Sequence, residues 1–348
     1  MKFSALALAG LADSKSTGNA SGLEVRQHGD AVLCYYTNWS QYRPGNCKYF
    51  PEDIDANLCT HLIFSFAKME QSTNGWTLAP YEWNDQDSDW SEGLYKRMNN
   101  LKRQNPSLKT LLAVGGWNHG SAGFMEMVAT DANIEQFITN SMQYVRDIDY
   151  DGLDLDWEYP AKCSVDCSPS SDAARFRRLV ELYRGRISSE NTITPFLLTA
   201  AVGIGRDKIY DFDGEQGDPS YSPKHLTDHL DMVNLMMYDT HGHWEDKTGH
   251  HALAHKMSGD DRLNGTTNVE WVIENWIQLG ADPSKISLGL GAYGRSFALE
   301  DPNNNGYLAP TKMQSTGLYS GEPGECTREG GYLAYYEICD RLRNKVRS

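Results

Sequence analysis

The amino-acid sequence predicts an α/β protein with parallel strands, and two observations lead to this fold class. Apolar runs of strand length recur along the chain of 348 residues, and segments of helical period separate them. Strands that alternate with helices at intervals of about 25–55 residues form parallel sheets with crossover connections. Seven such units fit either a (β/α)8 barrel without its last strand or a doubly wound sheet.

The expected elements follow from periodicity. The strands share a short apolar run and are expected at Ala31–Thr37, Thr60–Phe66, Lys109–Gly115, Gly152–Trp157, Leu197–Val202, Met232–Tyr238 and Ile286–Ala292. The helices share an amphipathic spacing and are expected at residues 92–104, 134–148, 172–187 and 269–280. The last helix ends at Gly280, a residue suited to a C-cap.

Polar and aromatic residues at the C-terminal ends of the expected strands favour the barrel, because barrel active sites form there. These residues are Trp39, Gly115, Gly116, Trp117, Asn118, Glu158, Tyr238, Asp239, Tyr293 and Arg295. A stretch rich in Gly and Asn, from about residue 297 to 336, reads as an insertion between barrel elements. No internal repeat is evident.

The fourth expected strand carries unusual negative charge. Its acidic residues are Asp151, Asp154, Asp156 and Glu158. Residues two apart share a face of a strand, so the last three carboxylates lie on one side and the intervening Leu, Leu and Trp on the other. Carboxylates in a confined row raise one another's pKa, so at least one carboxyl group of the row is expected to stay protonated near neutral pH. General acid catalysis needs such a proton.

Two other interpretations of this strand fit its sequence less well. An edge strand with a solvated acidic face is disfavoured by the apolar opposite face and by apolar strands on both sides in sequence. A divalent-metal site is disfavoured because carboxylates in a straight line seldom converge on one ion. The histidines between residues 241 and 251 read as a polar loop, so we expect no metal and no cofactor.

Composition limits the class of partner. The net charge of −15 disfavours nucleic acid and anionic membranes as partners and is compatible with a neutral substrate. No apolar run has the length of a membrane span. Residues 1–30 read as a signal-like segment followed by a disordered leader, which predicts secretion. Seven cysteines then indicate disulfides, with at least one thiol left over.

At the acidic strand the sequence resembles glycoside hydrolase family 18, the chitinases, in the branch of chitotriosidase and acidic chitinase. The stretch "DGLDLDWEYP" matches the family signature D-x-x-D-x-D-x-E in full. Further matches in the same order are "CYYTNWSQYRPG", "LCTHLIFSFA", "LLAVGGWN", "VNLMMYDTHGHWE", "LGAYGRSFAL" and "EGGYLAYYEIC". The resemblance runs from about residue 31 to 339.

The resemblance implies a (β/α)8 TIM barrel over residues 31–296 and an α+β insertion after the seventh strand, which is incomplete within residues 297–348. It also implies hydrolysis of β-1,4-linked N-acetylglucosamine with retention, assisted by the substrate's own acetamido group and without a metal. The expected partners are chitin and chitooligosaccharides, and we expect a secreted monomer.

The resemblance assigns roles by position. Glu158 is the general acid and then the base, and Asp156 hydrogen-bonds the N-acetyl group. Asp154 lies behind Asp156 and adjusts the pKa values of the row. Tyr238 holds the acetamido carbonyl against the anomeric carbon. The expected substrate-binding residues are Tyr35, Trp39, Phe66, Gly116, Trp117, Asn118, Met236, Asp239, Trp244, Tyr293 and Arg295. Aromatic rings suit sugars because pyranose C–H faces bury well against them.

The chain departs from the family pattern near its C-terminus. The family's eighth strand carries a Trp under the reacting sugar, and no Trp follows Trp276 here, so we expect a truncated chain. Cys34 and Cys59 match a family disulfide, and Cys339 matches a cysteine whose partner would lie further on. Cys163 and Cys167 are close enough for a local loop. Cys47 and Cys326 stay without an assigned partner.

Three functions remain open at this stage. The first is a secreted chitinase, which the intact Glu158 favours. The second is a chitin-binding lectin of the same fold, catalytically impaired by the truncation. The third, a hydrolase of the chitobiose core of N-glycans, is disfavoured by the match to the chitotriosidase branch.

Overall fold

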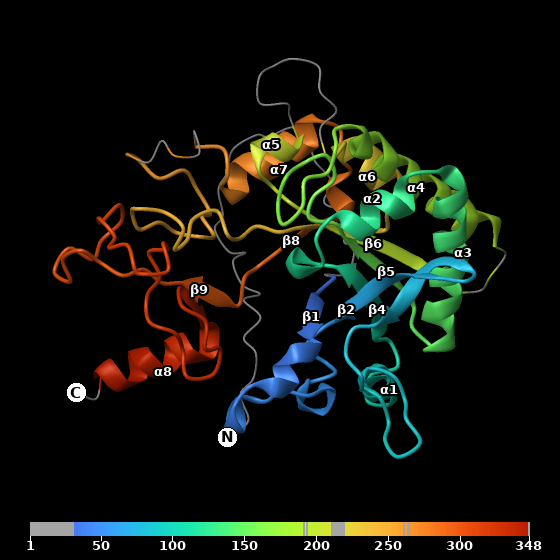
Figure 1. Cartoon of the computed structure of the whole chain (residues 1–348), viewed down its shortest axis with the longest axis horizontal. Helices are drawn as coiled ribbons and strands as arrows, with labels where there is room; N and C mark the ends of the chain where they lie inside the picture. Colours follow the sequence, from blue (N-terminus) through green and yellow to red (C-terminus); the bar gives the residue numbers. More distant parts are fainter. Residues whose placement is uncertain are drawn as a thin grey trace, which may run out of the picture.

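The computed structural model describes residues 31–346 apart from 191, 193, 210–219, 260, 261, 263 and 264. The signal-like segment and leader expected over residues 1–30 lie outside the described residues. A curled parallel sheet forms the centre of the molecule (Figure 1). Its strands are β1 (Leu33–Thr37), β2 (His61–Ser72), β4 (Lys109–Gly115), β5 (Gly152–Asp156), β6 (Leu197–Val202), β7 (Met232–Leu235) and β8 (Ile286–Leu288).

The strand order supports the barrel prediction. The parallel strands neighbour one another in chain order, β1-β2-β4-β5-β6-β7-β8, without the reversal that defines a doubly wound sheet. Side chains from β1, β5, β6 and β7 also meet inside the curl, as described below. The sheet therefore follows the (β/α)8 TIM-barrel path that was predicted, and seven of its strands are present in the described residues.

Several strands differ from the predicted bounds, among them β8, which ends at Leu288 rather than at Ala292. β2 continues beyond Phe66 and pairs with β3 (Gly75–Pro80) as an antiparallel ribbon. The extension was missed because exposed Lys68 and Glu70 alternate with buried residues and interrupt the apolar run. β7 ends at Leu235, so Tyr238 lies on the turn after the strand.

The helices cover the outer face of the sheet. All four expected helices are present, as α1 (Leu94–Asn99), α3 (Asp131–Asp147), α4 (Ser171–Ser189) and α7 (Val269–Gln278). Two helices of seven residues, α2 (Ala122–Val128) and α6 (Pro223–His229), are too short to show a clear period and were not predicted. None of the helices in the described part of the chain is long and apolar enough to cross a bilayer.

Helix α3 illustrates why these segments fold onto the sheet. Thr130 begins the helix as its N-cap, since its hydroxyl accepts a hydrogen bond from the Asn133 N–H at 3.1 Å. Ile134, Phe137 and Ile138 recur on one face and are fully buried. Burial of each such side chain stabilises the fold by roughly 1.5–3 kcal/mol, which fixes the helix against the strands.

Further elements follow β8. An antiparallel ribbon of β9 (Tyr293–Arg295) and β10 (Tyr332–Ala334) leads into α8 (Tyr335–Val346). Figure 1 shows β9 and α8 to one side of the parallel sheet, away from α3 and α4.

Disulfides tie distant segments together. The predicted Cys34–Cys59 bond is present, and Cys163 and Cys167 close a local loop. Cys47 bonds to Cys326 at a sequence separation of 279, a pairing that linear spacing does not reveal. Cys339 is free.

Candidate active site

The carboxylates of the acidic strand form a buried row at the centre of the sheet. β5 lies between β4 and β6, and Asp154, Asp156 and Glu158 are 0%, 5% and 9% exposed. On the other face, Leu153, Leu155 and Trp157 are buried among the helices. The predicted alternation is therefore correct, and the edge-strand interpretation is wrong, because both neighbours of β5 are paired to it.

Asp154 is held by side chains from three other strands. Its carboxylate accepts hydrogen bonds from the Tyr35 hydroxyl at 3.0 Å, the Thr199 hydroxyl at 2.5 Å and the Asn234 Nδ2 at 3.2 Å. Asn234 also donates to the Tyr35 hydroxyl at 3.0 Å. Burial raises the pKa of Asp154 to about 6, and these hydrogen bonds limit the increase.

Thr199 and Asn234 were not predicted as site residues. Each lies on an expected strand and breaks an otherwise apolar run, Thr199 within "LLTAAV" and Asn234 within "MVNL". A lone polar residue inside a buried parallel strand is the signal that could have identified them, since such a group needs a partner inside the barrel.

Asp156 has the most perturbed environment of the row. Its Oδ1 atom is buried and has no hydrogen-bond partner among the described residues. Burial, followed by the charges of Glu158 and Asp154, raises the pKa of Asp156 well above its usual range. A buried carboxyl oxygen without a partner is costly, and a ligand that supplies a donor would remove this cost.

Glu158 lies just beyond the end of β5. Burial raises the pKa of its carboxyl to about 6, and the Asp239 charge acts in the same direction. Hydrogen bonds from Tyr159 and from the Trp117 backbone oppose this shift, as does the charge of Lys208. A carboxylic acid with this pKa keeps a large protonated fraction near pH 6, as a general acid requires.

Two glycines bring β4 close to the row. Gly115 and Gly116 have φ values of +114° and +83°, which side-chain-bearing residues rarely adopt. A Cβ on Gly115 would lie 2.0 Å from the Asp156 carbonyl oxygen, and one on Gly116 would lie 2.7 Å from the Phe66 ring. Gly116 also donates its N–H to the Asp156 carbonyl at 2.9 Å. Both positions therefore require glycine.

Tyr238 and Asp239 follow β7 on a turn. Burial, followed by the charges of Asp156 and Glu158, raises the pKa of the Tyr238 hydroxyl. Asp239 accepts a hydrogen bond from Arg295 Nε at 2.8 Å, and His251 Nδ1 lies 3.7 Å from the same oxygen. Burial disfavours the Asp239 carboxylate, but these partners outweigh burial and hold its pKa well below the usual value.

The predicted aromatic residues form two groups. Trp39 stacks on Phe66 with ring centroids 6.1 Å apart, and Trp39 is about half exposed. Trp117 and Asn118, directly after Gly116, are also exposed. In the second group, the Arg295 guanidinium lies over the rings of Trp244, Tyr293 and Tyr332 at 5.3, 5.4 and 5.5 Å.

Tyr293 connects the second group to the row. Its ring packs edge-on against Tyr238 with centroids 6.0 Å apart, and its carbonyl lies 3.0 Å from His251 Nε2. Met236 is half-buried after β7, and its N–H donates to the Val202 carbonyl at 3.0 Å.

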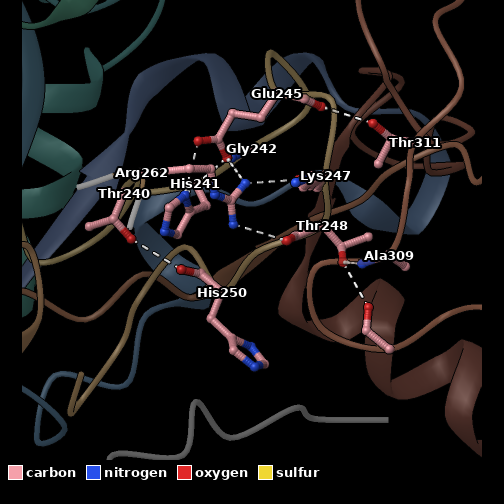
Figure 2. Close-up of polar contacts among 11 residues, drawn as sticks. Thr240, His241, Gly242, Glu245, Lys247, Thr248, His250, Arg262, Ala309 and Thr311 are labelled. Carbon is pink, nitrogen blue, oxygen red and sulfur yellow. Dashed lines mark hydrogen bonds and ion pairs between the residues drawn. The ribbon is translucent and has the colours of Figure 1, made fainter. Parts of the chain in front are cut away.

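The segment that carries Trp244 is fixed by a polar cluster, shown in Figure 2. The Glu245 carboxylate lies 3.0 Å from His241 Nδ1 and 3.1 Å from Arg262 Nη1. The Glu245 carbonyl accepts from the Thr311 hydroxyl at 3.0 Å. The Thr248 N–H donates to the Ala309 carbonyl at 3.0 Å. These contacts fasten residues 241–248 to the segment around 309–311.

In the described ranges of the chain, no three His, Cys, Asp or Glu side chains converge in a way that could hold a metal ion. His241 instead contacts the Glu245 carboxylate, and His251 contacts Asp239 and the Tyr293 carbonyl.

Comparisons with known proteins place the chain in a family. The model for glycosyl hydrolases family 18 matches residues 31–348. The chain is 40% identical to chitotriosidase-1 of Mus musculus over 311 residues, covering 88% of this chain and 61% of that protein. The chain thus spans less than two thirds of this relative's length.

Solved structures resemble the fold closely. An immunomodulatory active chitinase from Trichuris suis superposes with a TM-score of 0.78 at 34% identity, covering 90% of this chain and 78% of that chain. Human YKL-39, described as a pseudo-chitinase with retained chitooligosaccharide binding, gives a TM-score of 0.76 at 33% identity, covering 90% and 79%. With a family model that matches nearly all of the described residues, this chain belongs to the glycosyl hydrolases family 18.

Proposed function

We propose that this chain hydrolyses β-1,4 linkages between N-acetylglucosamine units in chitin and chitooligosaccharides, with retention and with assistance from the substrate's acetamido group. One observation carries the proposal. The buried row on β5 ends in Glu158, whose pKa is raised to about 6, beside Asp156, whose Oδ1 atom lacks a partner among the described residues. The first group can donate a proton, and the second can receive a donor from the substrate.

In the first step, protonated Glu158 donates its proton to the glycosidic oxygen while the bond from that oxygen to the anomeric carbon breaks. The acetamido carbonyl oxygen of the same sugar forms a bond to the anomeric carbon on the opposite face. Asp156 accepts a hydrogen bond from the acetamido N–H, and the Tyr238 hydroxyl donates to the acetamido oxygen. The positive charge that develops on the closed ring is stabilised by Asp156 and Asp154.

In the second step, Glu158 is a carboxylate and acts as a base. It takes a proton from a water molecule, whose oxygen attacks the anomeric carbon and breaks its bond to the acetamido oxygen. The two displacements together retain the anomeric configuration, and Glu158 regains its proton.

The surrounding residues suit a neutral polysaccharide. Trp39, Trp117 and Trp244 expose rings on which sugar faces can stack. Arg295 and Asp239 pair with each other, so the site adds little net charge for a neutral sugar to meet. The three disulfides support a further proposal of secretion, because such bonds persist in oxidising compartments.

A second candidate function is chitooligosaccharide binding without catalysis. The likeness to human YKL-39, a pseudo-chitinase with retained oligosaccharide binding, supports this alternative. The presence of Glu158 at the end of the row favours hydrolysis.

The test compares the wild-type chain with Glu158→Gln on a fluorogenic chitotrioside. Glu126→Gln is the matched control, since Glu126 is an exposed glutamate on α2. We expect turnover by the wild type and the control, and a loss of about 10³-fold or more in Glu158→Gln with binding retained. A folded wild type that binds oligosaccharides without turnover would support the lectin alternative. Equal turnover by the wild type, Glu126→Gln and Glu158→Gln would show that Glu158 is not the general acid.

A further inference from the structure

A lysine that the sequence did not single out packs against Tyr159, the residue that follows Glu158. Lys208 belongs to α5 (Arg206–Ile209), which follows β6, and its side chain is 16% exposed. Its ammonium group lies 4.4 Å from the centre of the Tyr159 ring, a cation–π contact. It also forms an ion pair with Asp207 at 2.8 Å.

Backbone and packing contacts fix this lysine. The Lys208 N–H donates to the Gly205 carbonyl at 2.9 Å, and the Lys208 carbonyl accepts from the Tyr221 N–H at 3.0 Å. A Cβ on Gly203 would lie 2.6 Å from the Tyr159 ring and 2.8 Å from Lys208 Cδ. The ring and the lysine stem therefore pack together over Gly203, which has no side chain to separate them.

Tyr159 connects this lysine to the reaction. Tyr159 directly follows Glu158 in the chain, and the interaction of its side chain with the Glu158 carboxyl lowers the pKa of that carboxyl. Once Glu158 has given up its proton, its negative charge faces the charge of Asp239 and the buried Asp156. The Lys208 charge offsets this repulsion, and its contact with the ring keeps Tyr159 in place to donate to the carboxylate.

We propose that Lys208 is a positioning residue that, through Tyr159, stabilises the ionised form of Glu158 and so sets the upper pH limit of turnover. This inference rests on the proposed function, in which Glu158 alternates between acid and base. The charged or titratable groups that interact with Glu158 are Asp156, Tyr159, Lys208, Tyr221, Tyr238 and Asp239.

The test is the pH profile of kcat/KM for Lys208→Met, which keeps an unbranched stem and removes the charge. The ionised carboxylate loses stabilisation in this variant, so we expect the alkaline limb to move to higher pH by about half a unit, or about threefold in proton affinity. Lys208→Arg keeps the charge and should leave the limb within about 0.2 units of wild type. Asp207→Asn removes the opposing charge, so its limb should move to lower pH.

A purely structural role would lower kcat/KM by one factor at every pH and leave the limb in place, and that result would overturn the proposal. A second measurement does not depend on turnover. The ¹³C carboxyl titration of Glu158 should move to higher pH in Lys208→Met and to lower pH in Asp207→Asn. Should the wild type fail to hydrolyse the chitotrioside, the proposed function fails, while unchanged titrations in both variants would refute the role of Lys208 by itself.

Discussion

Two parts of the site hold carboxyl groups whose pKa values are shifted in opposite directions. In the row on β5 the pKa values of Asp156 and Glu158 are raised, whereas the pKa of Asp239, which pairs with Arg295, is lowered. Glu158 and Asp156 lie among other carboxyls and away from a direct ion pair, so burial raises their pKa values. Asp239 is more exposed, at 37% of its side chain, and Arg295 at 2.8 Å and His251 hold its pKa well below the usual value. The difference comes from the partners rather than from depth alone.

This comparison indicates how one site can hold both a proton donor and a fixed negative charge. The ionised Asp239 raises the pKa of Glu158, so the second region helps to keep the first one protonated. Groups whose environments push their pKa values apart are suited to acid and base roles at one pH.

The largest effect is expected inside the row. Asp156→Asn keeps the shape of the side chain but cannot share a proton or carry negative charge, so kcat should fall about 100-fold on a chitotrioside. Asp147→Asn is the matched control, because Asp147 is exposed at the end of α3. A rate for Asp156→Asn equal to that of the control would contradict substrate assistance.

A smaller effect is expected from the pair. Asp239→Asn removes a negative charge that raises the pKa of Glu158, so the alkaline limb of kcat/KM should move to lower pH. Loss of the Arg295 contact should also lower kcat/KM about tenfold through poorer positioning. The pH profile of the variant measures both effects. An alkaline limb that moves to higher pH would show that the two regions are not coupled as described.

The smallest effect is on stability. The folded pKa of Glu158, about 6, lies above its unfolded value of 4.5. The stability that this group contributes is therefore fully present below pH 4.5 and is lost as the pH rises through 6. The Glu158→Gln side chain does not ionise and therefore keeps this contribution at high pH. The unfolding free energy of the variant should exceed that of wild type by on the order of 1 kcal/mol at pH 8. Urea unfolding at pH 4 and pH 8 tests this, and a larger gain at pH 4 would contradict it.

The fold and the row were accessible from the sequence because both leave local patterns. Alternation along residues 152–158 indicated two faces, and the structure buries both. The apolar spacing of α3 and α4 likewise marked the crossover helices. Such patterns depend only on neighbours along the chain.

The rest depends on contacts between distant residues. The Thr199 and Asn234 bonds to Asp154, the contact of Lys208 with Tyr159 and the Cys47–Cys326 disulfide all join separate elements. No local period encodes such pairs, and each becomes visible only when the strands are in register. The pairing of Asp239 with Arg295 across a separation of 56 residues belongs to the same class.

The most direct measurement is a ¹³C NMR titration of the side-chain carboxyls of the whole chain between pH 3 and 8, assigned with Glu158→Gln and Asp239→Asn. We expect Glu158 to titrate near pH 6 and Asp239 to remain ionised throughout the range. Titration of both groups near pH 4, the usual value for exposed carboxyls, would contradict the opposite protonation on which the proposed chemistry depends.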